Sequence, residues 1–222
     1  TSPHPKASAD TRNPVRPSTR YSMAVSYITD RSLAPARALR YSLPRMRHAR
    51  LGRTGLSVSR LCLGTMTFGL QCDEATSRDI LDRAGAGGIT FLGTAHRYPL
   101  GGGFETVGRT EEIVGRWLEG RRHDVVVATK CVGAMSDRRW DRGASRKHIL
   151  DAIDGSLRRL RTDYVDLYQL HHPDPETPID ESLRALDDVV RAGKARYVGC
   201  SNYHPYQVAR ALRRRRLLGL GR

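Results

Sequence analysis

From residue 60 onward, the chain alternates between short apolar runs and segments with a helical spacing of apolar residues. The apolar runs predict strands at residues 60–66, 88–92, 125–129, 164–170 and 195–200. After each run, apolar residues recur every three or four positions, which predicts a helix. Regular alternation of this kind favours a parallel sheet covered by helices. Two architectures fit the order: an open doubly wound sheet and a (β/α)8 barrel.

The residues after the first predicted strand help to choose between the two architectures. A dinucleotide-binding doubly wound fold carries G-x-G-x-x-G at this point. Here Gly64-Thr-Met-Thr-Phe-Gly69 stands instead, and Gly101-Gly102-Gly103 is no match either. The expected fold is therefore an α/β chain of the TIM-barrel type, incomplete, with about five βα units of eight. A hairpin is expected before it at residues 49–58, with Gly52 and Gly55 at the turn.

Helix ends can also be predicted from the residue types. The expected helices cover residues 76–84, ending at Gly85, then 110–118 with Thr110 as cap, and 145–160 with Ser145 as cap. Thr177 and Pro178 are expected to open the fourth helix, with Pro at its first position. The last helix is expected at residues 206–218, and Ser201-Asn202 could cap it.

Residues 1–46 differ in composition from the rest of the chain. They are rich in Ser, Pro, Arg and Ala, and only Asp10 and Asp30 are acidic. Such a segment buries too little apolar surface to offset its ordering entropy, which predicts a disordered basic extension. A transit peptide and an upstream stretch translated in error before Met46 are alternatives. Residues 47–222 form the predicted folded domain.

Composition limits the partners. The formal net charge of +15 suggests nucleic acid, but the basic residues form no single stripe with interleaved aromatics, so no nucleic-acid partner is expected. Arg213–Arg216 are interpreted as the solvated face of a helix. No apolar run is long enough to span a membrane.

The cysteines show no CxxC pair and no zinc-finger spacing, so neither a metal nor disulfides are expected. Free cysteines indicate a reduced, cytoplasmic protein. Packing is expected for three of them: Cys62, Cys131 and Cys200.

Chemically active side chains stand at the expected carboxyl ends of the strands, where a barrel carries its functional groups. Tyr98, Lys130 and His171 make a coherent set for proton transfer. A phenol holds its proton at neutral pH, a nearby ammonium lowers the pKa of that phenol, and an imidazole can orient a carbonyl. Because no side chain supplies hydride, a cofactor would have to do so. The other strand ends carry Thr65, Met66, Gly93, Ser201 and Asn202.

Four stretches together resemble the aldo-keto reductase family. Residues 47–69 look like the start of a bacterial member, and residues 88–98 followed by 109–115 resemble the first family signature. Residues 196–203 resemble the second signature, and residues 166–174 match the segment that carries the family's histidine. The resemblance implies a (β/α)8 barrel that reduces an aldehyde or ketone to an alcohol with NADPH. The implied partner is a small-molecule carbonyl substrate.

Matching positions carry over the family's roles. Tyr98 would be the general acid, Lys130 would lower the pKa of Tyr98, and His171 rather than His172 would orient the carbonyl. The residues expected at the nicotinamide carboxamide are Ser201 and Asn202, and those near the nicotinamide ribose are Thr65 and Met66.

The chain departs from the family pattern in two places. Gly93 stands where the family has an aspartate that pairs with the lysine. An unpaired and partly buried Lys130 would tend to lose its charge, so carbonyl reduction is expected to fall. The sequence also stops before the family's sixth strand, so the expected partial barrel has exposed edges and is marginally stable, prone to aggregation or dependent on a partner.

Three functions therefore compete at the level of sequence. The leading one is an NADPH-dependent oxidoreductase, with the activity of this chain in question. The alternative is an inactive or regulatory relative, which Gly93 favours. A nucleic-acid binder is the third. Substrate and oligomeric state cannot be predicted from these residues, because fold alone does not fix specificity.

Overall fold

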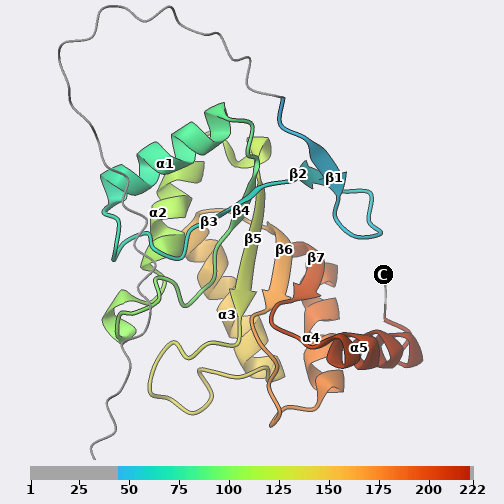
Figure 1. Ribbon diagram of the computed structural model, residues 1–222. Coiled ribbons are helices and arrows are strands. Elements are labelled where there is room, and N and C mark those ends of the chain that lie inside the picture. The colour runs from blue at the N-terminus through green and yellow to red at the C-terminus, as the bar shows by residue number, and fades with distance from the viewer. Residues whose placement is uncertain (1–44, 221–222) are drawn as a thin grey trace, which may run out of the picture. The chain divides into compact units, whose positions relative to one another are not determined.

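Five parallel strands form the sheet of the computed structural model, which describes residues 45–220. Their order in space is their order in the chain, as Figure 1 shows. A doubly wound sheet reverses its strand order at one point, whereas a barrel does not. The strands therefore form an incomplete TIM-barrel-type sheet, as predicted. They are β3 (Cys62–Gly64), β4 (Phe91–Gly93), β5 (Val126–Cys131), β6 (Val165–Leu170) and β7 (Ala195–Cys200).

The register aligns the carboxyl ends of the strands at one edge of the sheet. Gly64 pairs with Gly93, Gly93 with Ala128, and Ala128 with Leu167. Within the described residues, β3 and β7 each pair with a single strand, so the sheet is open there. The loops that leave the strand ends meet in one region, which is where a barrel assembles its functional side chains.

An antiparallel hairpin precedes the sheet, as expected. It consists of β1 (His48–Arg50) and β2 (Ser57–Ser59), paired from His48↔Ser59 to Arg50↔Ser57. Gly52 has a φ of +59° in the connecting turn, a backbone conformation that residues other than glycine rarely adopt. The predicted extension over residues 1–46 lies outside the described residues, apart from Arg45 and Met46.

The five predicted helices are all present. They are α1 (Glu74–Ala86), α2 (Arg109–Leu118), α3 (Arg146–Leu160), α4 (Ile179–Arg191) and α5 (Pro205–Leu217), with short 3₁₀ turns η1 (Phe104–Thr106) and η2 (Arg122–Asp124). Ser145 caps α3 as predicted, because its side chain accepts a hydrogen bond from the amide of His148.

Four predicted helix ends were wrong. Helix α1 begins after Asp73 and passes Gly85 to end at Ala86. Gly108, with φ +84°, is the cap of α2, while the hydroxyl of Thr110 donates to the carbonyl of Phe68 instead. Pro178 is the cap of α4 rather than its first residue. His204, not Ser201-Asn202, caps α5. Thr110 shows one reason: its hydroxyl had a second possible partner far along the chain, which the sequence does not reveal.

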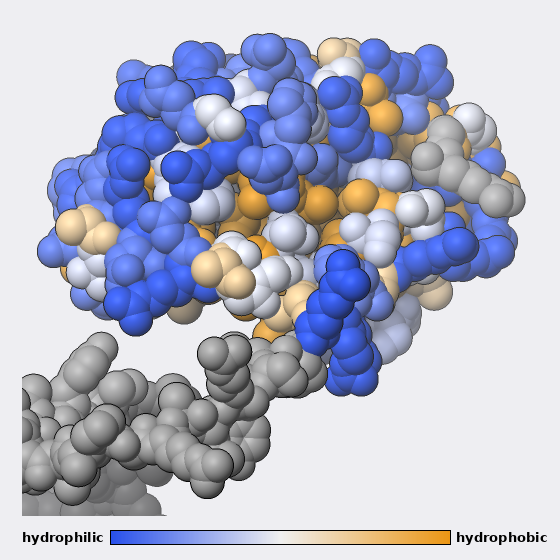
Figure 2. Space-filling view, turned by 90° about the horizontal axis from the view of Figure 1, so that it is seen from above, coloured by the Kyte–Doolittle hydropathy of each residue, from blue (hydrophilic) through white to orange (hydrophobic). Residues whose placement is uncertain are grey.

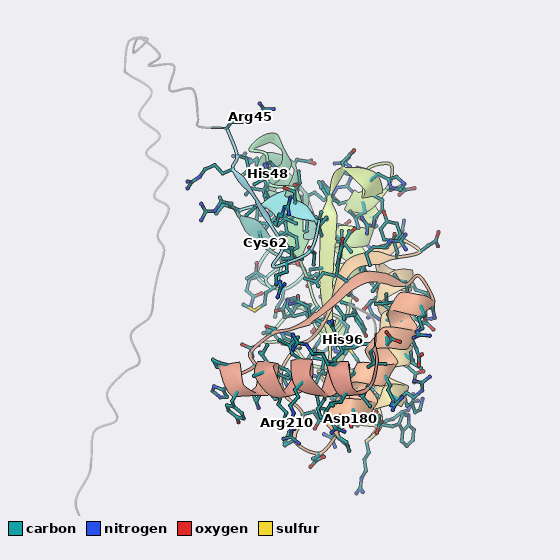
Figure 3. All side chains as sticks on the ribbon, turned by 90° about the vertical axis from the view of Figure 1, so that its right-hand side faces the viewer. Arg45, His48, Cys62, His96, Asp180 and Arg210 are labelled. Atoms are coloured by element: carbon teal, nitrogen blue, oxygen red, sulfur yellow. The ribbon has the colours of Figure 1, made fainter. Side chains whose placement is uncertain are left out.

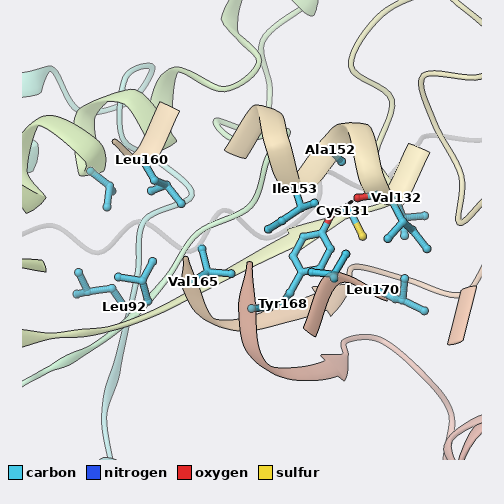
Figure 4. Close-up of a cluster of buried hydrophobic side chains, with 14 of the residues drawn as sticks. Leu92, Cys131, Val132, Ala152, Ile153, Leu160, Val165, Tyr168 and Leu170 are labelled. Carbon is cyan, nitrogen blue, oxygen red and sulfur yellow. Dashed lines mark hydrogen bonds between the residues drawn. The ribbon is translucent and has the colours of Figure 1, made fainter. Parts of the chain in front are cut away.

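Helix α3 packs its apolar face on the sheet. Ile149, Ile153 and Leu160 are fully buried in this layer, and Figure 4 labels Ile153 and Leu160. The phenol of Tyr168 on β6 donates to the carbonyl of Ile149 at 3.0 Å, so a buried polar group is satisfied inside the core. This packing holds β5 and β6 in place. Of the candidate site residues, Lys130 lies on β5 and His171 directly follows β6.

Apolar surface is visible on one face of the molecule. Figure 2 shows hydrophobic side chains gathered across its middle, with hydrophilic side chains around them. Of the helices within residues 45–220, none combines the length and the apolar character needed to cross a bilayer.

Candidate active site

Tyr98 and His171 meet at the carboxyl end of the sheet. The phenol oxygen of Tyr98 lies 3.4 Å from Nε2 of His171, and the two rings are edge to face with centroids 5.5 Å apart. Tyr98 follows β4, and its carbonyl accepts hydrogen bonds from the amides of Gly108 and Thr110 at the start of α2. His171 directly follows β6. The tyrosine loop is therefore fixed to a helix, and the histidine to a central strand.

Lys130 on β5 completes the cluster. Its ammonium lies 5.2 Å from the centroid of the Tyr98 ring and donates to the carbonyl of Thr94 at 2.9 Å. Burial lowers the pKa of Lys130, and the neighbouring Cys62 and Glu111 partly oppose that shift. The three residues expected to transfer a proton and to orient a carbonyl are thus brought together from the loop after β4, from β5 and from the end of β6.

The protonation states follow from burial. Burial raises the pKa of Tyr98, so the phenol keeps its proton at neutral pH. Burial and the charge of Lys130 lower the pKa of His171 to about 4, so its imidazole is neutral. Lys130 is not among the groups that shift the pKa of Tyr98. The site therefore holds a protonated phenol beside a neutral imidazole. The charge of Lys130 lowers the pKa of His171 and does not shift that of Tyr98.

Gly93 leaves one side of the cluster without a carboxylate. A Cβ at this position would lie 3.3 Å from Sγ of Cys62 and 3.8 Å from the carbonyl of Leu63.

The packing role expected for Cys62 is wrong: the residue is exposed at the sheet edge, and its thiol interacts electrostatically with Lys130. Buried Cys131 and half-buried Cys200 do lie in strands, and all four cysteines are free. Sequence reasoning missed Cys62 because a strand position does not tell which face it occupies.

Ser201 and Asn202 follow β7 and present hydrogen-bonding groups beside His171. The amide nitrogen of Asn202 donates to the carbonyl of His171 at 2.8 Å and to the hydroxyl of Ser201 at 3.2 Å. Asn202 has a φ of +60° and is exposed, so its amide oxygen is accessible. An exposed amide and a hydroxyl suit the carboxamide of a nicotinamide, since that group both donates and accepts.

Thr65 and Met66 follow β3, at the other edge of the sheet. The hydroxyl of Thr65 is buried and donates to the carbonyl of Gly93 at 3.1 Å, whereas Met66 is 43% exposed. Within residues 45–220, no hydrogen bond joins this pair to Ser201 or Asn202. The exposed Met66 offers an apolar surface to a ligand, while Thr65 mainly fixes β3 against β4.

Two buried histidines lie against one another, and the sequence did not predict this contact. His96 and His148 have ring centroids 5.4 Å apart, and their ring nitrogens are buried without hydrogen-bond partners. His96 comes from the loop that carries Tyr98, and Figure 3 labels its position. In the part of the chain that the structure describes, no group of three or more His, Cys, Asp or Glu residues is arranged to hold a metal ion.

The order of the parallel strands and the meeting of Tyr98, Lys130 and His171 at their carboxyl ends define a barrel-type α/β protein with a cluster suited to proton transfer. The family model described as "Aldo/keto reductase family" matches residues 60–218, and the chain belongs to this family of oxidoreductases.

Three relatives illustrate the range of the family. The "Uncharacterized oxidoreductase YrpG" of Bacillus subtilis is 44% identical over 185 residues, covering 79% of this chain and 56% of the relative. The "Protein tas" of Escherichia coli is 39% identical over 190 residues, covering 75% and 55%. A "Probable voltage-gated potassium channel subunit beta" of rice is 40% identical over 171 residues, covering 75% and 49%. The chain thus spans about half the length of these relatives.

Proposed function

We propose that this protein reduces an aldehyde or ketone to the corresponding alcohol with NADPH. The observation that carries the proposal is the meeting of Tyr98, Lys130 and His171 at one end of the sheet, with a protonated phenol 3.4 Å from a neutral imidazole. Membership of the aldo/keto reductase family supports the reaction class. Four free cysteines support a cytoplasmic location.

His171 would orient the substrate. Because burial and Lys130 keep its imidazole neutral, Nε2 can carry a proton and donate a hydrogen bond to the carbonyl oxygen. The carbonyl of His171 accepts a hydrogen bond from Asn202, which ties the histidine backbone to the end of β7. The substrate carbonyl oxygen would therefore accept hydrogen bonds from both Nε2 of His171 and the phenol of Tyr98.

Tyr98 would act as the general acid. NADPH, when bound, supplies the hydride that reduces the carbonyl carbon. The phenol of Tyr98 donates its proton to the carbonyl oxygen, which leaves an alcohol and a phenolate. Lys130, 5.2 Å from the centre of that ring, would stabilise the phenolate. Ser201 and Asn202 would hold the nicotinamide carboxamide, and Met66 would contact the adjoining ribose.

A regulatory relative is the second candidate, and Gly93 is the observation that favours it. Without a carboxylate beside Lys130, burial lowers the lysine pKa and weakens its ability to stabilise a phenolate. Such a protein would bind the cofactor without turning over a carbonyl.

The first test is to follow NADPH consumption by the purified protein with a panel of aromatic and aliphatic aldehydes, with NADH in parallel. Cofactor binding is measured separately by nicotinamide fluorescence. Consumption with NADPH supports the reductase, and binding without consumption supports the regulatory relative. The absence of both binding and consumption rules out both candidates.

A further inference from the structure

A cleft of about 880 Å³ opens beside the candidate site, between two loops at the carboxyl end of the sheet. One wall is the segment 132–145 that follows β5. The other is the segment 172–177 that follows β6. His172 lines the cleft, and its ring centroid lies 6.1 Å from that of His171. The cleft therefore begins one residue beyond the histidine proposed to orient the carbonyl.

Two arginines in this cleft lack counter-ions. Arg139 and Arg142 both line it and are exposed, and within residues 45–220 neither forms an ion pair or a side-chain hydrogen bond. By contrast, the next two basic residues of the chain are neutralised: Arg146 pairs with Asp188 and Lys147 pairs with Asp151. The cleft thus contains two unpaired guanidinium groups on one short loop.

The carboxylates of the cleft do not neutralise these arginines. Asp174 points inward, where Oδ2 accepts hydrogen bonds from the amide of Ala144 and the hydroxyl of Thr177, both at 2.7 Å. Its Oδ1 accepts the amide of Glu176 at 3.0 Å. Asp174 therefore fastens the two loops together, and Glu176 is the remaining acidic side chain of the lining.

Trp140 adds an aromatic surface between the two arginines. It lines the cleft and is 56% exposed, an unusual degree for an indole. A flat apolar group can stack on an indole, and planar guanidinium groups bind a carboxylate or phosphate through paired hydrogen bonds. The formal charge of +15 for the whole chain also raises the local concentration of anions.

We infer that this cleft binds the anionic end of the carbonyl substrate, a carboxylate or phosphate carried on a flat apolar group, with Arg139 and Arg142 holding the anion and Trp140 the apolar part. The inference rests on the proposed function for the position of the carbonyl. A substrate of this kind places its carbonyl at Tyr98 and His171 and extends past His172. An aromatic aldehyde with the anion opposite the aldehyde group has a suitable shape.

Binding can be measured without turnover, because Trp140 is a built-in probe. The other tryptophan, Trp117, is only 5% exposed, so quenching by a ligand in the cleft should come from Trp140. The ligands are 4-formylbenzoate and its methyl ester, which has a similar shape without the charge. Phenyl phosphate is a third ligand that separates phosphate from carboxylate recognition. A Trp140→Phe protein confirms the source of the signal.

The variants are Arg139→Gln/Arg142→Gln and, as the matched control, Arg138→Gln, which alters a neighbouring arginine that does not line the cleft. We expect 4-formylbenzoate to bind at least about tenfold more tightly than its ester, and the double variant to lose that preference while the control keeps it. Equal binding of acid and ester, or an unchanged double variant, overturns the inference. Selective binding of the acid without NADPH consumption supports the cleft and counts against the reductase. Equal kcat/KM for acid and ester supports the reductase and overturns the cleft.

Discussion

The phenol oxygen of Tyr98 lies 3.4 Å from Nε2 of His171, although 73 residues separate them in the chain. The contact joins a loop fixed by α2 to the end of β6. Strand β5 lies between β4, which precedes the Tyr98 loop, and β6. Lys130 on β5 is therefore enclosed between Tyr98 and His171, and its ammonium donates a hydrogen bond to the carbonyl of Thr94.

Replacing Tyr98 by Phe removes the proposed proton donor while keeping the ring that packs against His171. We expect kcat for carbonyl reduction to fall by about 10²-fold or more, the usual contribution of acid–base catalysis. Cofactor affinity, measured by fluorescence, should stay the same. Tyr206→Phe is the matched control, since Tyr206 is 68% exposed on α5. Equal losses in the two variants would remove Tyr98 from the mechanism.

Gly93→Asp should raise turnover, because the new carboxylate raises the pKa of Lys130 and keeps the lysine charged up to a higher pH. The new Cβ would press on Sγ of Cys62 at 3.3 Å, so the substitution is made in a Cys62→Ala protein. A charged Lys130 favours the phenolate, so the pKa of Tyr98 should fall and the high-pH limb of kcat should move to lower pH. Gly93→Asn, made in the same Cys62→Ala protein, gives a similar shape without the charge. A pH profile and a turnover that match the Asn variant would contradict the hypothesis.

Acidification should destabilise the fold through His96 and His148. Burial lowers the pKa of both, and the mutual repulsion of the two rings lowers that of His96 further, together with Arg159, His171 and Arg97. Asp141 and Asp151 oppose the shift at His148, and Lys147 adds to it.

When the folded pKa is depressed, the unfolded chain binds more protons, so stability is full above the unfolded value of 6.5 and is lost as the pH falls through the folded one. Thermal melts at a series of pH values below neutrality should show Tm falling progressively. His96→Phe keeps the ring contact with His148 and should reduce the slope. His123→Phe is the control, because that ring lies on an unburied turn, η2. Parallel slopes in all three proteins would exclude the pair as the cause.

Arg159→Met should strongly destabilise the chain because it leaves a charge buried. Glu111 is fully buried, and its carboxylate accepts from Nε of Arg159 at 2.8 Å and from the hydroxyl of Thr129 at 2.5 Å. Removing the cation costs about 3–5 kcal/mol in the free energy of unfolding, because the buried carboxylate keeps the Thr129 hydroxyl as a donor but has no compensating cation. Urea denaturation measures the change. Lys147→Met removes an exposed partner of Asp151 and should leave the midpoint in place.

Arg159→Met combined with Glu111→Gln tests the cause. The amide of Gln carries no charge, so the double variant should be more stable than Arg159→Met alone. Equal stability would show that lost packing of the arginine, and not the buried charge, is responsible.

Not every arginine of the basic helix α5 is a solvated surface residue. Arg214 forms an ion pair with Asp180 at the start of α4, and Figure 3 shows Asp180 near α5, with Arg210 labelled on that helix. Part of the Arg213–Arg216 run therefore joins two helices. The expectation that this run is the solvated face of a helix holds for the exposed Arg213 and Arg216. It does not hold for Arg214, which pairs with Asp180, or for the half-buried Arg215.

The amino-acid sequence by itself determined the strands, the helices and their order. Apolar runs and helical spacing recur because buried strands and amphipathic helices each require a fixed period, and that period is local. The sequence also placed Tyr98, Lys130 and His171 at successive strand ends, and parallel pairing of the strands had to bring these ends to one edge of the sheet.

The tertiary structure decided the features that depend on partners distant in the sequence. Which hydroxyl caps a helix depends on competing acceptors, so Thr110 bonds Phe68 instead of its own helix. Cys62 on β3 lies near Lys130 on β5, and His96 lies against His148 on α3, because the pairing of the strands and the packing of α3 set those contacts. The protonation states of the site depend on burial, which is a property of the folded chain. No local pattern contains that information, since the neighbours that exclude water come from segments far apart in sequence.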